Sequence, residues 1–406
     1  MEADADMEPN AFLPLLFLWA DPVIAPPHPS IHHIEQVSPP AEPSPVIEIE
    51  ASYVGEVVGT VAGGKNRGAA YLDNGYLAAV ADLDQLAGWK GGQAAISVLY
   101  NNGASLGKFV GDDHGASNIE TGVKAVRLYE AWIEQRFAST SFRIGLYDLN
   151  SEFDALESSS LFVGSSHGIG TDIGQSGRNG PSIFPVTSLA LRADVELKPG
   201  LLFRAAVLDA VPGDPENPSR TAILLRKGDG ALLIGEADMR IEGARFLLGH
   251  WRYTATFNRH DGASDHGNEG WYLRGEATLW QKASKRLSAF FRLGTASGKF
   301  NKMDRFASGG LHLLAPFSVR PDDAVGIAVS TGLTSSQYRL EVPSTKSEKV
   351  VEATYLLRLN PWLTLQPSTQ WILSPGSDPV AKDALVFGLR VAMRFNWSRT
   401  APLIAN

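Results

Sequence analysis

Residues 128–154, LYEAWIEQRFASTSFRIGLYDLNSEFD, alternate polar and apolar side chains with a period of two. An extended strand with this spacing would carry on one face Glu130, Trp132, Glu134 and Arg136. Its other face would carry Tyr129, Ala131, Ile133 and Phe137. After a break at 138–140, residues 141–148 repeat the alternation. The stretch therefore predicts two paired strands with one mainly ionic face and one mainly apolar face.

A soluble sheet would bury the apolar face, whereas a closed barrel could turn it toward lipid and enclose a polar lumen. No helix predicted from the sequence could span a bilayer, because the longest apolar run, residues 11–20, has ten residues and includes Pro14. Cys is absent, which excludes disulfides and thiolate zinc sites. The net charge of −8 and the lack of a basic face argue against nucleic-acid binding. We expect no metal and no cofactor.

Sixteen alternating segments lie between turn signals, and most have about the 9 to 11 residues that a tilted transmembrane strand needs. They are 53–62, 75–84, 93–101, 126–137, 141–148, 186–197, 201–209, 231–241, 245–256, 270–279, 287–296, 306–315, 324–333, 349–359, 363–373 and 384–395. From the second segment onward, the first connections alternate between short and long. Barrels of the outer membrane have tight periplasmic turns and long external loops, so this alternation favours an even-stranded barrel.

The predicted fold is all-β, a transmembrane antiparallel β-barrel of about 16 strands over residues 51–397. A long loop between the fifth and sixth strands, residues 149–185, is expected to fold inward and narrow the pore. Residues 1–50 are predicted to hold a weak signal-like segment, with acidic residues ahead of the apolar run, and a disordered tail with eight prolines between residues 22 and 45. Residues 398–406 are predicted to be a C-terminal extension.

Arginines from many strands are predicted to line the lumen with carboxylates, and among them are Arg136, Arg143, Arg192, Arg204, Arg252, Arg274 and Arg292. Such a lining excludes apolar solutes and offers paired donors to sugar hydroxyls. Trp132, Tyr147 and Trp280 are the aromatic side chains expected to stack against sugar rings. For any single arginine, an ordinary interior ion pair is the alternative. Aromatic residues near strand ends, including Tyr129, Trp251 and Tyr253, would form the interfacial girdles.

Residues 164–168, GSSHG, match the G-x-S-x-G pattern of a serine nucleophile elbow. That chemistry also needs a following helix and a base on an α/β sheet, and neither is predicted here. A secreted esterase that uses Ser166 is thus only an alternative to the barrel. A soluble all-β binding module is a second alternative. We predict that the chain is not an enzyme.

Several segments resemble the carbohydrate-selective outer-membrane porins of the OprB family. They are YEAWIEQRF, FRIGLYDLNSEFD, SSLFVGSSHGIG, GPSIFPVTSLALR and the stretch from Val350 to Phe395. The resemblance implies a Gram-negative outer-membrane barrel through which glucose and related sugars diffuse without chemistry. It also implies that the loop beginning at Asp148 shapes the constriction. The chain differs from the family pattern where eleven residues follow Phe395, because members usually end at an aromatic residue.

The candidate residues of the pore constriction come from the fourth, fifth and sixth strands and from the loop. They are Glu130, Trp132, Glu134, Arg136, Arg143, Tyr147, Asp148, Asn150, Glu152, Asp154 and Arg192. The expected partners are small sugars and outer-membrane lipid, with a homotrimer and a monomer both possible.

Overall fold

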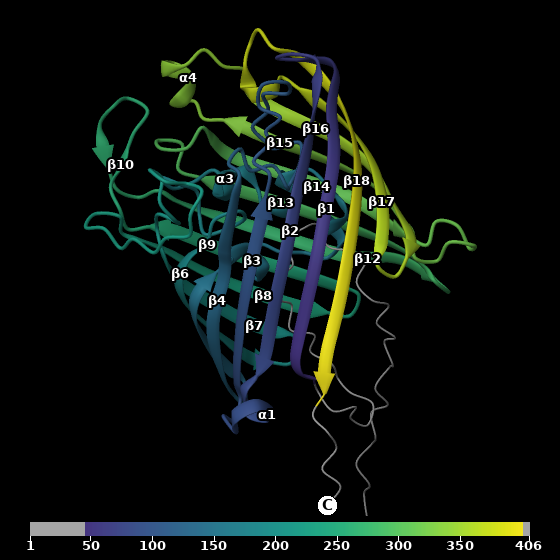
Figure 1. The fold of residues 1–406 in the computed structure, drawn as a ribbon. Coiled ribbons are helices and arrows are strands. Elements are labelled where there is room, and N and C mark those ends of the chain that lie inside the picture. The colour runs from purple at the N-terminus through teal and green to yellow at the C-terminus, as the bar shows by residue number, and fades with distance from the viewer. Residues whose placement is uncertain (1–44, 401–406) are drawn as a thin grey trace, which may run out of the picture.

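The computed structural model describes residues 45–400, and sixteen strands of this part of the chain close into one antiparallel barrel (Figure 1). The barrel strands are β1 (Pro45–Gly64), β2 (Gly68–Asp82), β3 (Gly92–Asn101), β4 (Ala125–Phe137), β5 (Thr140–Tyr147), β6 (Ser188–Lys198), β7 (Leu201–Asp209), β8 (Ala231–Ile241), β9 (Ala244–Tyr253), β12 (Glu269–Lys282), β13 (Lys285–Ala296), β14 (Met303–Leu314), β15 (Ala324–Thr334), β16 (Ser347–Asn360), β17 (Leu363–Leu373) and β18 (Lys382–Thr400). The predicted number of strands and the barrel are confirmed.

Each strand pairs with its neighbours in the chain, and β1 closes the barrel by pairing with β18. Figure 1 shows the first strand in purple beside the last in yellow. Two short strands, β10 (Phe257–Asn258) and β11 (Ser264–Asp265), pair only with each other in the connection between β9 and β12. Closure leaves no open sheet edge, which is the condition for a sheet to lie in lipid.

The described helices are short and lie in connections. They are α1 (Leu83–Ala87), η1 (Leu149–Ser151), η2 (Ser158–Leu161), α2 (Ser165–Gly168), α3 (Thr171–Gly174), α4 (Tyr338–Glu341) and η3 (Pro375–Ser377). Within residues 45–400, no helix has the length and apolar character needed to cross a membrane. The tight connections, including those at 138–139, 199–200 and 242–243, share one end of the barrel with α1, and the long ones share the other end.

The first and last strands are longer than predicted. β1 begins at Pro45, so residues 45–50 belong to the barrel and not to the tail, and residues 1–44 lie outside the described residues. β18 continues to Thr400, so part of the predicted 398–406 extension is strand, and residues 401–406 also lie outside the described part. The reason is mutual pairing: Ile49 lies opposite Trp397, and Ile47 opposite Arg399.

Two strand irregularities change which residues face the lumen. The register of β3 and β4 shifts between Ser97 and Val98, so Tyr129 and Glu130 both point inward and Tyr129 is only 1% exposed. The register of β12 and β13 shifts after Thr278, so Trp280 lies opposite Leu287 and is 45% exposed. The prediction of Tyr129 in an outer girdle and of Trp280 in the lumen is therefore wrong, because each β-bulge reverses the alternation locally.

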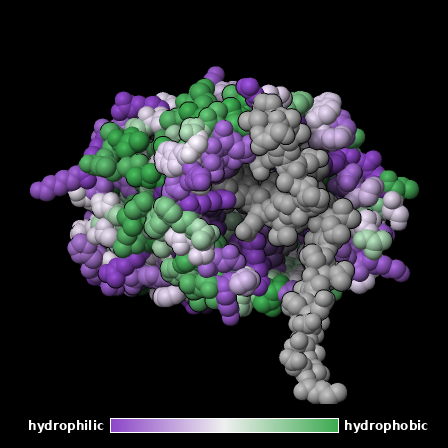
Figure 2. Space-filling view, turned by 90° about the horizontal axis from the view of Figure 1, so that it is seen from below, coloured by the Kyte–Doolittle hydropathy of each residue, from purple (hydrophilic) through white to green (hydrophobic). Residues whose placement is uncertain are grey.

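Strand β9 also differs from the prediction. Trp251 and Tyr253 are almost completely buried inside the barrel, while Arg252 between them is exposed on the outer wall. The interior here accommodates aromatic side chains because part of the connection between β5 and β6 packs against them. Along the central parts of β6, β7 and β8 the alternation holds, with exposed residues such as Leu191, Val207 and Leu233 outside. Viewed from the short-turn end, hydrophobic patches alternate with hydrophilic residues around the rim (Figure 2).

Candidate functional site

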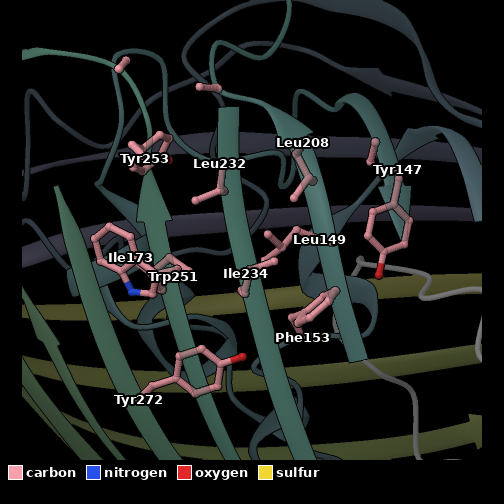
Figure 3. Packing of buried hydrophobic residues seen from close by; sticks show 14 of the residues in the cluster. Tyr147, Leu149, Phe153, Ile173, Leu208, Leu232, Ile234, Trp251, Tyr253 and Tyr272 are labelled. Carbon is pink, nitrogen blue, oxygen red and sulfur yellow. The ribbon is translucent and has the colours of Figure 1, made fainter. Parts of the chain in front are cut away.

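The connection between β5 and β6, residues 148–187, is held against the inner faces of several strands. Its apolar side chains Leu149, Phe153 and Ile173 belong to one buried cluster with Leu232 and Trp251 from β8 and β9. Figure 3 shows these loop residues beside the side chains of the strands. Burial of these apolar side chains stabilises the loop in this position, by about 25 cal/mol of free energy for each Å² of apolar surface removed from water.

A chain of charged side chains joins four neighbouring strands, β4 to β7, to this loop. Glu134 Oε2 of β4 accepts hydrogen bonds from Nε of Arg143 and from Nη2 of Arg192, each at 2.9 Å. Arg192 also donates to both carboxylate oxygens of Glu152, at 2.7 and 2.9 Å. Arg204 Nη1 on β7 donates to the backbone carbonyl of Glu152 at 2.9 Å. We refer to these five residues as the constriction network, after the pore constriction that the sequence predicts at this loop.

The aromatic residues predicted for the site lie directly beside this network. The guanidinium carbon of Arg143 is 3.8 Å from the ring centroid of Trp132, a cation–π contact. Tyr147 donates its hydroxyl to Glu152 Oε2 at 2.5 Å. Gly145 lies opposite Trp132 with φ +145°, and a Cβ at this position would be 2.1 Å from the carbonyl oxygen of Ala131. Glycine is therefore required at 145 for β5 to approach β4 at the Trp132–Arg143 pair.

The charge on Glu152 is set by its neighbours. Burial acts to raise the pKa of this loop carboxyl, but the guanidinium groups of Arg143, Arg192 and Arg204 outweigh it and hold the pKa well below its usual range. Glu152 therefore stays ionised at neutral pH. Three cations surrounding two carboxylates leave a net positive charge among these five residues.

A second charged cluster lies further along the loop. Asp154 accepts from Arg292 Nε at 2.9 Å, and Arg292 Nη1 donates to Asp172 at 2.6 Å. Arg274 donates to the carboxylate of Asp154 and to the backbone carbonyls of His167 and Gly168. All four charged side chains are buried. We call Asp154, Asp172, Arg274 and Arg292 the anchor cluster, because it ties two parts of the loop to β12 and β13.

The remaining predicted residues surround these groups. Tyr129 donates to Asp148 at 2.6 Å, and Glu130 accepts the backbone N–H of Asp148 at 3.2 Å. The Asn150 side chain donates to backbone carbonyls within the loop, so it stabilises the loop and does not face the network. Arg136 donates to Glu134 at 2.8 Å and is half exposed toward the turn between β4 and β5.

The connection between β3 and β4, residues 102–124, was not predicted to enter the barrel, yet it also contacts the inner wall. Glu348 of β16 accepts the backbone N–H groups of Asp113 and His114 at 2.9 Å. Arg390 of β18 donates to Asn118 at 2.8 Å. Sequence reasoning missed this segment because its polar composition is equally typical of an exposed loop. Its length of more than twenty residues was the one available signal.

The G-x-S-x-G segment is not arranged as a nucleophile elbow. Ser166 lies in the four-residue α2, and its hydroxyl is 3.3 Å from the hydroxyl of Ser330. The loop there rests on Glu352, which accepts the N–H groups of Val163 and Gly164. These contacts give the segment a structural role inside the barrel.

Together, the apolar outer wall, the closed sixteen-stranded sheet and the ionic interior define a class of protein, the outer-membrane porins. Residues 66–395 match the family model described as carbohydrate-selective porin, OprB family. Porin B of Pseudomonas aeruginosa is 24% identical over 403 residues, which covers 86% of this chain and 87% of that protein. The chain therefore belongs to the OprB family of carbohydrate-selective porins, and it is a protein of the Gram-negative outer membrane.

Solved structures show the same fold. The high-pH structure of Pseudomonas putida OprB matches with a TM-score of 0.75 at 22% identity, covering 86% of this chain and 94% of that one. A mutant of the Rh. blastica porin matches with a TM-score of 0.52 at 10% identity, covering 86% of this chain and all of that one. Family membership implies a channel and not an enzyme.

Proposed function

We propose that this porin admits glucose and related small sugars by passive diffusion, and that the constriction network selects them. The observation that carries the proposal is the convergence of Arg143, Arg192 and Arg204, from three adjacent strands, on Glu152 of the loop. The side chains of Arg143 and Arg192 are only 2% and 1% exposed, so they hold Glu152 in place, whereas Arg204 and Glu152 are each 10% exposed and would meet the sugar. A guanidinium held in a fixed plane can donate paired hydrogen bonds to vicinal hydroxyls of a pyranose. The carboxylate of Glu152 accepts a hydrogen bond from a sugar hydroxyl in return.

The proposed mechanism is an exchange of hydration. A sugar loses part of its water shell in a narrow polar passage, and the charged wall replaces the lost hydrogen bonds. Trp132 fixes the plane of Arg143 by stacking on it, and the buried Tyr147 helps to fix Glu152 by donating a hydrogen bond to it. Binding must remain weak, because a solute that is held tightly cannot leave. No covalent step is involved.

The loop at 148–187 has two roles in this proposal. Its first residues, Asp148 to Asp154, supply part of the passage wall, and the anchor cluster keeps them at a fixed distance from the strands. Fixing both sides of the passage lowers the entropy lost when a sugar binds, since fewer side chains must be ordered.

Planar-bilayer conductance with sugars titrated into the bath tests the proposal. We expect a channel whose current falls as glucose is added and falls less with an apolar solute of similar size. Trp132→Ala should raise the half-blocking sugar concentration by roughly 2- to 10-fold, because Arg143 loses the cation–π contact that fixes its plane. Trp371→Ala, which removes an exposed indole from the outer wall, is the matched control. A current that sugars do not change would refute the selectivity.

A further inference from the structure

The outer wall of the barrel has a groove across β6, β7 and β8, with a volume of about 430 Å³. Its floor consists of the small residues Ala193, Ala205 and Gly235, and a ridge along one side consists of Leu191, Val207 and Leu233. We call this the outer groove. It is separate from the constriction network, because these residues point away from the lumen.

Strand register explains the shape of the outer groove. Ala193 lies opposite Ala205, and Ala205 lies opposite Gly235, so three small side chains adjoin on three neighbouring strands. The ridge residues occupy the next outward position on the same strands. The atoms that line an empty groove lack van der Waals partners on one side. An acyl chain that fills the groove supplies these contacts, and they stabilise it even though the hydrophobic effect does not act within lipid.

The two ends of the groove lie at different depths in the membrane. At one end, the floor continues from Gly235 to His250, which lies near the long-loop end of β9. At the other end, it continues from Ala193 to Phe142, which lies near the short-turn end of β5. Because long loops mark the cell exterior, the groove descends from the outer leaflet toward the periplasmic side. Trp271 is exposed beside His250, with ring centroids 4.3 Å apart, as expected of an interfacial aromatic residue.

A cationic side chain marks the outer end. Arg252 lines the groove, and its Nε lies 3.5 Å from Glu269 Oε2, with the two side chains 54% and 44% exposed. An exposed pair of this kind contributes little free energy, so the guanidinium can bind another anion. Phosphate is the favoured partner, because the planar fork of arginine binds it through two hydrogen bonds.

We propose that the outer groove is a binding site for a phosphorylated lipid of the outer leaflet. One acyl chain lies along Gly235, Ala205 and Ala193, and the phosphate lies on Arg252 with His250 beside it. The charge at the outer end favours this occupant over a second copy of the chain. A second copy would have to bury the Arg252–Glu269 pair, which costs desolvation free energy.

The first experiment fills the groove. Gly235 has no positive φ, and a Cβ there would find its nearest atom at 3.7 Å, so larger side chains fit the backbone. The purified full-length barrel is titrated with bisphosphorylated lipid A in detergent, and bound lipid is counted by native mass spectrometry. We expect Gly235→Leu to lower lipid occupancy about tenfold, whereas Gly235→Ala retains most of it. Ala205→Phe provides a second blocked groove if Gly235→Leu does not fold.

The second experiment changes the charge at the outer end. Arg252→Gln should weaken binding of bisphosphorylated lipid A several-fold and leave binding of dephosphorylated lipid A unchanged. Glu269→Gln should strengthen binding of the phosphorylated form. Equal occupancy in the wild type and in both blocked variants would overturn the site. A binding strength that does not depend on the phosphate would overturn the headgroup assignment, and a dimer that Gly235→Leu abolishes would identify a second copy as the occupant.

Discussion

The carboxylate of Asp154 lies 2.8 Å from Nη2 of Arg292, although 138 residues separate the two in the chain. Both side chains are completely buried, and Arg292 is shared with Asp172. This pair joins the loop after β5 to the wall of β13. It makes the position of the loop depend on the barrel wall and not on the loop alone.

Asp154→Asn should weaken the attachment of the loop. Asp154 has φ +53°, which asparagine also tolerates, so the substitution removes the charge without straining the backbone. Arg274 and Arg292 would lose a buried counter-charge, which typically costs about 3 kcal/mol. Urea unfolding of the barrel in detergent measures the loss. Asp261→Asn removes an exposed partner of Arg259 and should change stability by less than about 0.5 kcal/mol. Equal effects of the two substitutions would contradict the anchoring role.

Glu134→Gln should shift the channel toward anions. Glu134 is the shared acceptor of Arg136, Arg143 and Arg192, so its neutralisation makes the charge of the constriction network more positive. The reversal potential in a potassium chloride gradient reports this change. Glu242→Gln, in the exposed turn between β8 and β9, removes the same charge outside the lumen and should have a smaller effect. An unchanged reversal potential for Glu134→Gln would mean that the network does not border the conducting path.

Ala131→Arg should destabilise the barrel by about 2 to 4 kcal/mol if position 131 meets hydrocarbon near the middle of the membrane. Ala131 lies on the outward face of β4, between Ile96 of β3 and Leu146 of β5. The temperature of the gel-mobility shift on heating should therefore fall. Ala131→Leu adds a side chain without charge and should leave that temperature almost unchanged. If arginine and leucine were tolerated equally, the outer face would not contact lipid.

Gly145→Ala should destabilise β5 and disturb the contact between Trp132 and Arg143. A Cβ at 145 would be 2.1 Å from the Ala131 carbonyl and 2.6 Å from Cα of Trp132, and φ is +145°. We expect a cost of about 1 to 3 kcal/mol, together with a change in indole fluorescence. Gly235→Ala is the matched glycine control, because its backbone is unstrained and its surroundings leave room. Equal stability of the two variants would show that the strand relaxes around the new methyl group.

The sequence by itself determined that the fold is a barrel of sixteen strands and which face of most strands is ionic. An alternation with a period of two can be recognised from neighbouring residues alone. The alternation stays regular because an ionised side chain on the lipid-facing wall destabilises the barrel. The arginines at 192, 204, 274 and 292 were placed on the inner wall by this rule alone, and all four are buried there.

Only the tertiary structure decided which strands carry bulges, and therefore that Tyr129 faces inward and Trp280 outward. It also decided which arginines meet Glu152 and which meet Asp154, and it placed small residues of three strands side by side as the outer groove. The physical reason is that a bulge, a loop contact and a groove each depend on the register between segments. Register is set by pairing partners that lie far apart in the chain, so no local pattern records it.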